Sequence, residues 1–73
     1  QLLLQREALA VVAQAMAELP ASQRAVVTLR DVDGLEATEV CHVLEISETN
    51  QRVLLHRGRS KVRAALERYR ATR

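Results

Sequence analysis

The sequence has few aromatic residues, little cysteine and little of the two residues that most often interrupt helices. It contains one tyrosine, Tyr69, no tryptophan or phenylalanine, one cysteine, one proline and two glycines. A core without large rings must be aliphatic, and a lone cysteine excludes an internal disulfide, which suits a reducing cytoplasm. No apolar run approaches the roughly 20 residues that span a bilayer, and the apolar start is too short for a signal peptide. We therefore expect a cytoplasmic location and no membrane insertion.

Alanine, leucine, glutamate, glutamine and arginine are abundant instead, and these residues favour helices. Hydrophobic residues make up 48% of the 73 positions. A chain of this length supports one domain with a small core. We expect a single all-α domain over residues 1–73. Because the chain starts without methionine in what looks like the body of a helix, we also expect it to be a fragment of a longer protein.

The formal net charge of +2 conceals a division along the chain. Residues 1–46 carry three arginines and seven acidic residues, a net charge of −4. Residues 47–73 carry eight lysines and arginines and two glutamates, a net charge of +6. A basic segment joined to an acidic one is typical of a surface that faces a polyanion. An isolated charged run is more often only a solvated helix face, but this run coincides with the second helix of a turn motif, which favours nucleic acid.

Hydrophobic periodicity predicts four helices, over about residues 2–19, 21–32, 36–44 and 48–70. Pro20 ends the first helix. Asp33 and Gly34 end the second, and Gly34 is free to take a positive φ. Ser47 is an N-cap for the fourth helix, and Glu48 is favoured by the helix dipole.

Each predicted helix has an apolar side that we expect to face the core. In the first helix this side comprises Leu2, Leu9, Val12, Ala13, Met16 and Leu19. In the second it comprises Val26, Val27 and Leu29. In the fourth it comprises Leu55, Val62, Leu66 and Tyr69, with the small residues Gly58 and Ala65.

Residues 36–59 form the most informative stretch, a helix-turn-helix pattern whose second helix is rich in arginine. The first helix of the pair has apolar Val40, Val43 and Leu44 at helical spacing, beside the small Cys41. A helix-turn-helix lays its second helix in the DNA major groove, where arginine can bridge O6 and N7 of guanine. The pattern therefore predicts a DNA-reading module.

A series of short motifs runs through most of the chain, from about residue 19 to residue 66. The motifs are Leu19-Pro20, Gln23-Arg24, Leu29-Arg30, Asp33-Gly34-Leu35, Glu39-Val40, Leu44, Ile46-Ser47-Glu48 and Leu55-His56-Arg57. In this order they resemble region 4 of bacterial RNA polymerase sigma factors, and the extracytoplasmic-function group, also called group 4, fits best.

The resemblance implies a four-helix module that recognises the −35 promoter element and directs transcription initiation. It also implies docking on the flap of the β subunit of the RNA polymerase core, and control by an anti-sigma factor. We expect the aliphatic surface between the first two helices and the end of the fourth to bind the flap, with the anti-sigma factor competing for that surface or for the basic face.

The resemblance also implies the residues that contact DNA. In the last helix these are Glu48, Thr49, Asn50, Arg52, Val53, His56, Arg57 and Arg59, and in the second helix Arg30. We expect Arg52 and Arg57 to read bases, and Arg30 and Arg59 to position the module on phosphates.

Four positions depart from the family pattern. Glu45 stands in the turn where many relatives have glycine, and a positive φ there would cost about 1 kcal/mol. Gln51 and Leu54 replace valine and arginine of many relatives, so we expect Leu54 in the core and Gln51 partly exposed. Val53 replaces a small polar residue, which predicts an apolar contact, such as one to a thymine methyl group.

Other chemistry has little support in the sequence. Cys41, His42 and His56 are too few for a metal site, which normally uses four ligands, and Cys41 suits a buried, inert position where the motif helices cross. Catalytic triads, glycine-rich phosphate loops and paired carboxylates are absent from the sequence. We therefore expect no enzyme activity, cofactor, metal or small-molecule substrate.

Two alternative functions remain at this stage. Response regulators have a similar helical output domain that binds DNA and dimerises through its last helix, although the Leu19-Pro20 and Leu55-His56-Arg57-Gly58-Arg59 motifs favour a sigma factor. A protein-interaction module would instead bind DNA weakly and use the apolar surface of its first two helices.

Overall fold

The computed structural model describes the backbone of residues 2–72 and the side chains of residues 4–72. In that range all regular structure is helical: α1 (Leu2–Glu18), α2 (Ala21–Val27), η1 (Thr28–Val32), α3 (Ala37–Leu44) and α4 (Glu48–Ala71). The short η1 is a π-helical continuation of α2, in which the Asp33 N–H donates to the Thr28 carbonyl at 2.9 Å. The predicted all-α fold with four helices and a helix-turn-helix is confirmed. Among these described helices, none combines the length and the apolar character needed to cross a bilayer.

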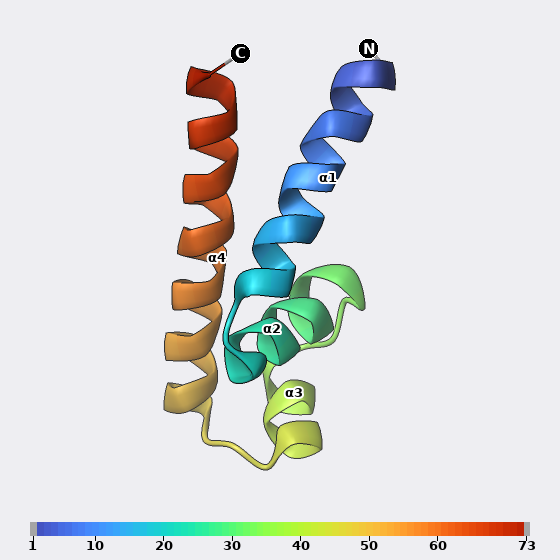
Figure 1. Cartoon of the computed structure of the whole chain (residues 1–73). Coiled ribbons are helices and arrows are strands. Elements are labelled where there is room, and N and C mark those ends of the chain that lie inside the picture. The colour runs from blue at the N-terminus through green and yellow to red at the C-terminus, as the bar shows by residue number, and fades with distance from the viewer. Residues whose placement is uncertain (1, 73) are drawn as a thin grey trace.

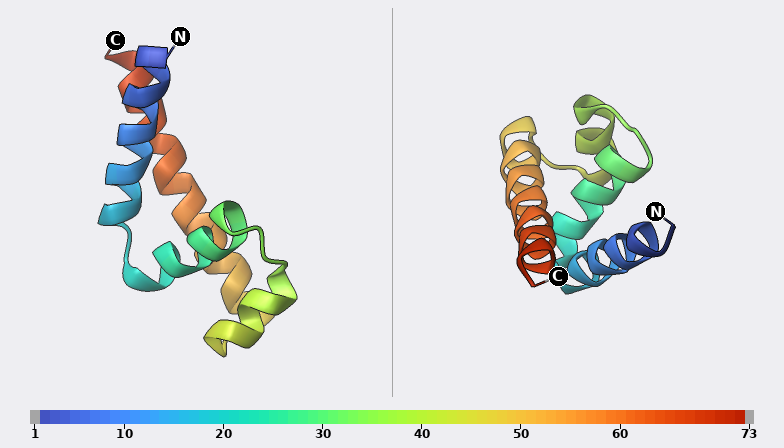
Figure 2. Two further views of the ribbon diagram at one scale, coloured as in Figure 1. Left: turned by 90° about the vertical axis from the view of Figure 1, so that its right-hand side faces the viewer. Right: turned by 90° about the horizontal axis from the view of Figure 1, so that it is seen from above.

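The two long helices α1 and α4 lie side by side and run in opposite directions (Figure 1). The shorter α2, η1 and α3 pack around the end where α1 finishes and α4 begins, as the left view of Figure 2 also shows. The molecule is elongated, with principal extents of 40 × 19 × 15 Å. The start of α4 is thus braced by the short helices on one side, while its other side faces solvent.

The core is small, aliphatic and confined to this braced end. Leu19, Val26, Val27, Val40 and Leu55 form one buried cluster, and Val26 and Val40 are 0% exposed. The partly buried side chains packed against it are Met16, Leu29, Leu35, Leu44, Ile46, Leu54 and Val62. The predicted core positions of α2 and α4 are therefore confirmed where they meet this cluster.

The predicted apolar side of α1 is wrong in part. Leu9 is 67% exposed and Ala13 is also exposed, whereas Ala15 is buried. Leu19 is buried as predicted, Val12 and Met16 are half-buried, and the Leu2 side chain lies outside the described residues. The helix is rotated so that Ala15 and Leu19 meet the core. Because Val, Ala and Leu occupy most of α1, its sequence favours no single face strongly.

Local signals end and begin the helices where the sequence predicted. The Ser47 hydroxyl accepts a hydrogen bond from the Asn50 N–H at 3.0 Å, which caps α4. Gly34 has φ 76° in the loop before α3, and Glu45 has φ 56° at the end of α3. Glu45 therefore takes the left-handed conformation that glycine would adopt most easily, and it turns the chain sharply between the two helices of the motif.

Gly58 lets α4 approach α2 closely. An added Cβ at this position would lie 2.5 Å from Val27 Cγ2 and 3.5 Å from the Gln23 carbonyl oxygen. The contact leaves no room for a side chain, so Gly58 determines how near the two helices lie.

Candidate nucleic-acid interface

The first half of α4 presents one side to the core and the other to solvent. Gln51, Leu55 and Gly58 are buried on the inner side. The predicted DNA-contacting residues of α4 are all exposed: Glu48, Thr49, Asn50, Arg52, Val53, His56, Arg57 and Arg59. The structure therefore brings these residues together on a solvent-facing part of one rigid helix, which the Ser47 cap and the packed inner side hold in place.

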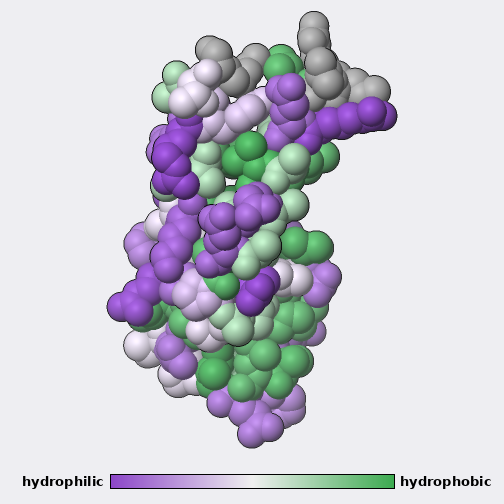
Figure 3. All heavy atoms as spheres, in the orientation of Figure 1, coloured by the Kyte–Doolittle hydropathy of each residue, from purple (hydrophilic) through white to green (hydrophobic). Residues whose placement is uncertain are grey.

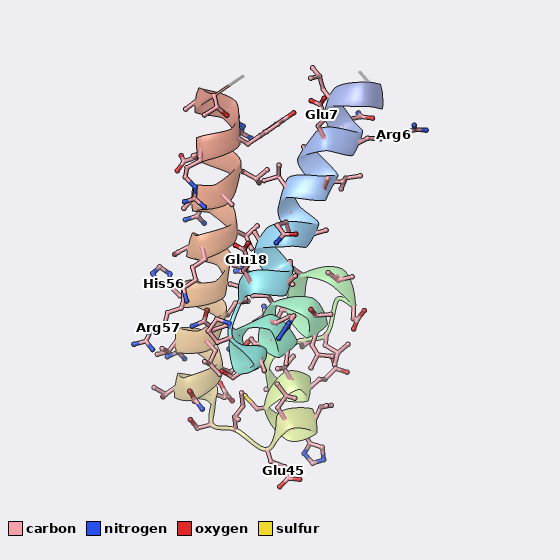
Figure 4. The ribbon with its side chains drawn as sticks, viewed as in Figure 1. Arg6, Glu7, Glu18, Glu45, His56 and Arg57 are labelled. Atoms are coloured by element: carbon pink, nitrogen blue, oxygen red, sulfur yellow. The ribbon has the colours of Figure 1, made fainter. Side chains whose placement is uncertain are left out.

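Arg52, His56 and Arg57 are available for a ligand. His56 and Arg57 point away from the other helices (Figure 4). In the described part of the chain, no ion pair or hydrogen bond engages the side chain of Arg52 or Arg57. Two unpaired guanidinium groups on an exposed helix can accept planar bidentate partners such as a guanine edge or a phosphate.

Arg30, in contrast, is half-buried and already has a partner. Its Nη1 donates to Oε1 of Gln51 at 2.8 Å, joining η1 to the inner side of α4. The expectation that Gln51 is partly exposed is wrong, since its residue is only 3% exposed. Leu54 does pack against the core as predicted. Gln51 is buried because its amide supplies an acceptor for Arg30, which offsets the cost of removing both groups from water.

Arg59, on α4, has an acidic partner on η1, the element that also carries Arg30. The Nε of Arg59 donates to Oδ2 of Asp31 at 2.8 Å and its Nη2 donates to Oδ1 at 2.5 Å. The hydrogen bonds from Arg59, together with its positive charge, hold the pKa of the Asp31 carboxyl below its usual value of 3.8. Asp31 is therefore ionised at neutral pH. The two side chains remain 43% and 38% exposed, so the pair lies at the surface next to the candidate interface.

Sequence reasoning did not identify Gln51 or Asp31 as partners of the proposed phosphate-contacting arginines. The two contacts join residues 21 and 28 positions apart, on elements whose packing no local pattern reveals. The sequence shows only that Arg30 and Asp31 are neighbours. Because consecutive side chains of an α-helix point about 100° apart, this does not predict that both reach α4.

A second surface feature lies between the long helices. An apolar groove of about 430 Å³ is bounded by α1, η1 and α4, and its apolar lining residues are Val12, Met16, Val27, Val32, Val62 and Leu66. Asp31, Arg59 and Arg63 also line it. Leu9 at 67% and Val32 at 71% exposure lie in or beside this region. In Figure 3, hydrophobic side chains are visible between the two long helices, and hydrophilic ones gather along the α4 side.

The Cys41 side chain does not occupy the fully buried position that the sequence suggested. It is half-buried, and the neighbouring Val40 fills the core instead. Among the described residues, no group of three or more histidine, cysteine or acidic side chains could hold a metal ion.

Comparison with known protein families shows which family the chain belongs to. Residues 9–62 match the family described as sigma-70, region 4. The match includes most of α1, all of α2, η1 and α3, and the exposed first half of α4. A search of curated proteins found no significant match. The helix-turn-helix with its basic, solvent-facing second helix and the matched residues lead to one conclusion: the chain belongs to the sigma-70 region 4 family, the promoter −35 recognition module of RNA polymerase sigma factors.

Proposed function

We propose that this chain is region 4 of an extracytoplasmic-function sigma factor and that the exposed first half of α4 reads the −35 element. The exposure pattern of α4 carries the proposal. Every predicted contact residue from Glu48 to Arg59 faces solvent, while the residues between them that face inward are buried. The net charge of +6 over residues 47–73 supplies the long-range attraction for DNA.

Arg52 and Arg57 have the main base-reading roles in this proposal. Five residues along an α-helix rotate the side-chain direction by about 140°, so these arginines project from opposite edges of the exposed side. They flank Val53, which is 39% exposed and can contact a thymine methyl group, and His56. Glu48, Thr49 and Asn50 lie at the N-terminal end of the helix, the end that contacts base edges in helix-turn-helix proteins.

Phosphate contacts position the module on the duplex. Arg30 and Arg59 lie to one side of the base-reading residues, on η1 and on the second turn beyond Arg52. Both retain unused N–H groups, because a guanidinium has five donors and each arginine spends only one or two on its internal partner. Such contacts fix register without carrying sequence information.

The apolar groove between α1 and α4 is the proposed docking site for the β-flap of RNA polymerase. Val32 lines the groove, and Leu9 lines a shallow hollow that adjoins it at Val12 and Leu66. Both are large aliphatic residues that remain mostly exposed in the free chain, and an amphipathic helix laid along the groove and this hollow would cover them. An anti-sigma factor that covers the groove or the α4 surface would block polymerase or promoter binding, and this competition is the proposed mode of control.

The base-reading assignment is tested with three single variants in the holoenzyme. Arg52→Ala and Arg57→Ala should each weaken binding to −35-dependent promoters by about 1–3 kcal/mol and reduce transcription from them. Arg68→Ala removes the same charge from the last part of α4, outside the proposed docking groove, and should have a much smaller effect. Equal losses from all three variants would indicate a diffuse basic face and would contradict the assignment.

Docking on the polymerase is tested by binding of the purified β-flap to the chain. Leu9→Gln and Val32→Gln should reduce flap affinity without lowering helicity, because both side chains are already largely in water. If the flap does not bind, and no anti-sigma protein competes for the groove, a DNA-binding regulator such as a response-regulator output domain becomes the better interpretation.

A further inference from the structure

Arg59 is in the proposed DNA-contacting set, yet in the free chain it is engaged by a carboxylate. Both oxygens of Asp31 are used, one by Nε and one by Nη2 of the guanidinium. This bidentate arrangement is the one that a phosphate group would adopt with the same arginine. Asp31 thus occupies the part of Arg59 that an incoming DNA phosphate would use.

Two consecutive side chains of the π-helical turn Thr28–Val32 reach α4: Arg30 contacts Gln51, and Asp31 contacts Arg59. Gln51 and Arg59 are eight residues apart, a rise of about 12 Å along α4. η1 therefore contacts α4 at two points along the helix. The contact at Gln51 is a hydrogen bond to a buried amide, and the contact at Arg59 is an exposed ion pair.

The position of the pair makes exchange with DNA feasible. Asp31 and Arg59 are 38% and 43% exposed, so the ion pair is surrounded by solvent and has a small net strength. Asp31 is also a fixed negative charge beside the surface that DNA approaches. It opposes phosphate binding in two ways, by occupying Arg59 and by repelling the phosphate itself.

We propose that Asp31 limits the DNA affinity of the α4 surface by competing with backbone phosphates for Arg59. The proposal rests on the proposed DNA-binding function. It adds to the residues that provide DNA affinity one residue, Asp31, that lowers this affinity. Such a limit acts on every DNA sequence, because Arg59 contacts phosphate and not base edges. It would keep the module from binding non-specific DNA strongly and leave promoter choice to the base-reading residues.

The test compares Asp31→Asn with Asp33→Asn in this chain, by fluorescence anisotropy on a labelled duplex that carries no promoter sequence. Asp33 is an exposed acid two residues away that makes no ion pair among the described residues, so its substitution is a control for net charge. Asp31→Asn should tighten binding about two- to fivefold, the range that breaking an exposed ion pair allows. The slope of log K against log salt should steepen by about 0.9, the value for one added phosphate contact. Asp33→Asn should give a smaller gain and no change in slope.

The same comparison in an Arg59→Gln background isolates the arginine. There, Asp31→Asn should have no larger effect than Asp33→Asn, because the group for which Asp31 competes is gone. Helical circular dichroism checks that each variant is folded, and Asp31→Ala is a second variant should the asparagine keep a hydrogen bond to Arg59.

The outcomes separate this proposal from the function on which it rests. If the unmodified chain binds no duplex DNA even at low salt, both the proposed function and this inference are wrong. If it binds, but Asp31→Asn matches Asp33→Asn or weakens binding, only this inference is overturned. Weakened binding would mean that Asp31 holds Arg59 in the orientation that contacts DNA.

Discussion

Two residues that adopt a left-handed backbone conformation, Gly34 and Glu45, lie in the connections before and after α3. Glycine adopts this conformation easily, whereas glutamate does not. Gly34 has φ 76° and no atom within 4 Å of where a Cβ would stand. Glu45 has φ 56° and ψ 50°, and its side chain adds the steric cost that glycine avoids. The turn of the helix-turn-helix therefore contains a residue whose backbone is strained, because the turn requires a left-handed conformation and the residue is not glycine.

Glu45→Gly should stabilise the chain by about 1 kcal/mol, because removal of the side chain relieves the left-handed strain. For a domain of this size that corresponds to a rise in Tm of roughly 4–8 °C. Thermal unfolding followed by circular dichroism measures it.

Gly34→Ala is the reverse change, because it places a side chain on a residue with positive φ. It should destabilise the folded chain by about 1 kcal/mol. Since space around Gly34 is open, the whole loss is conformational. An unchanged or lower Tm for Glu45→Gly would show that the Glu45 side chain makes a compensating contribution at the end of α3.

At the scale of the helices, the close approach of α4 to α2 at Gly58 determines how the candidate DNA surface is oriented. Val27 is β-branched, helical and only 5% exposed, so it has little freedom to move aside. The Cγ2 methyl group of Val27 therefore occupies the space that a side chain at position 58 would need.

Gly58→Ala should lower stability by about 1 kcal/mol, despite alanine's better helix propensity. The propensity gain is about 1 kcal/mol, while overpacking against Val27 costs about 1–3 kcal/mol. Chemical denaturation measures the difference.

The double variant Val27→Ala with Gly58→Ala is the control for this mechanism. Removing Val27 Cγ2 makes room for the new Cβ, so the double variant should be more stable than the sum of the two single losses predicts. Additive losses would indicate that the contact with Val27 is not the cause.

Across the whole molecule, stability is unevenly distributed. All buried residues of the described chain lie between Ala15 and Gly58, so the first part of α1 and the last part of α4 form a two-helix arm without a buried core. Near the end of this arm, the Tyr69 hydroxyl donates to Oε1 of Glu7 at 2.7 Å. Figure 4 shows Glu7 on the side of α1 that faces α4.

Hydrogen exchange should reveal this gradient. Amides in residues 4–14 and 62–72 should exchange faster than those in residues 23–29 and 51–58, because local opening of the arm exposes little buried apolar surface. Tyr69→Phe should accelerate exchange in the arm and leave the braced end unchanged. Uniform protection along α4 would contradict an arm that opens separately.

Most of the fold could be predicted because its signals are local. Pro20, Gly34 and Ser47 act through backbone conformation or a hydrogen bond within a few residues, so they end or begin helices whatever surrounds them. The exposed side of α4 was predictable for a related reason. Charged and polar residues alternate there with Leu55 and Gly58 at helical spacing, and burial of that apolar side leaves only one side for solvent.

Tertiary structure decided what local patterns left open. The inward side of α1 depends on where α4 lies, so Ala15 is buried and the larger Leu9 is exposed. Gln51 is buried because Arg30, 21 residues earlier, supplies its hydrogen bond. Arg59 is paired because Asp31, 28 residues earlier on η1, packs next to it. The sequence by itself thus determined the helices and the basic surface, whose causes act over a few residues. Which of those basic groups are free depends on contacts between distant segments, which only the packed chain creates.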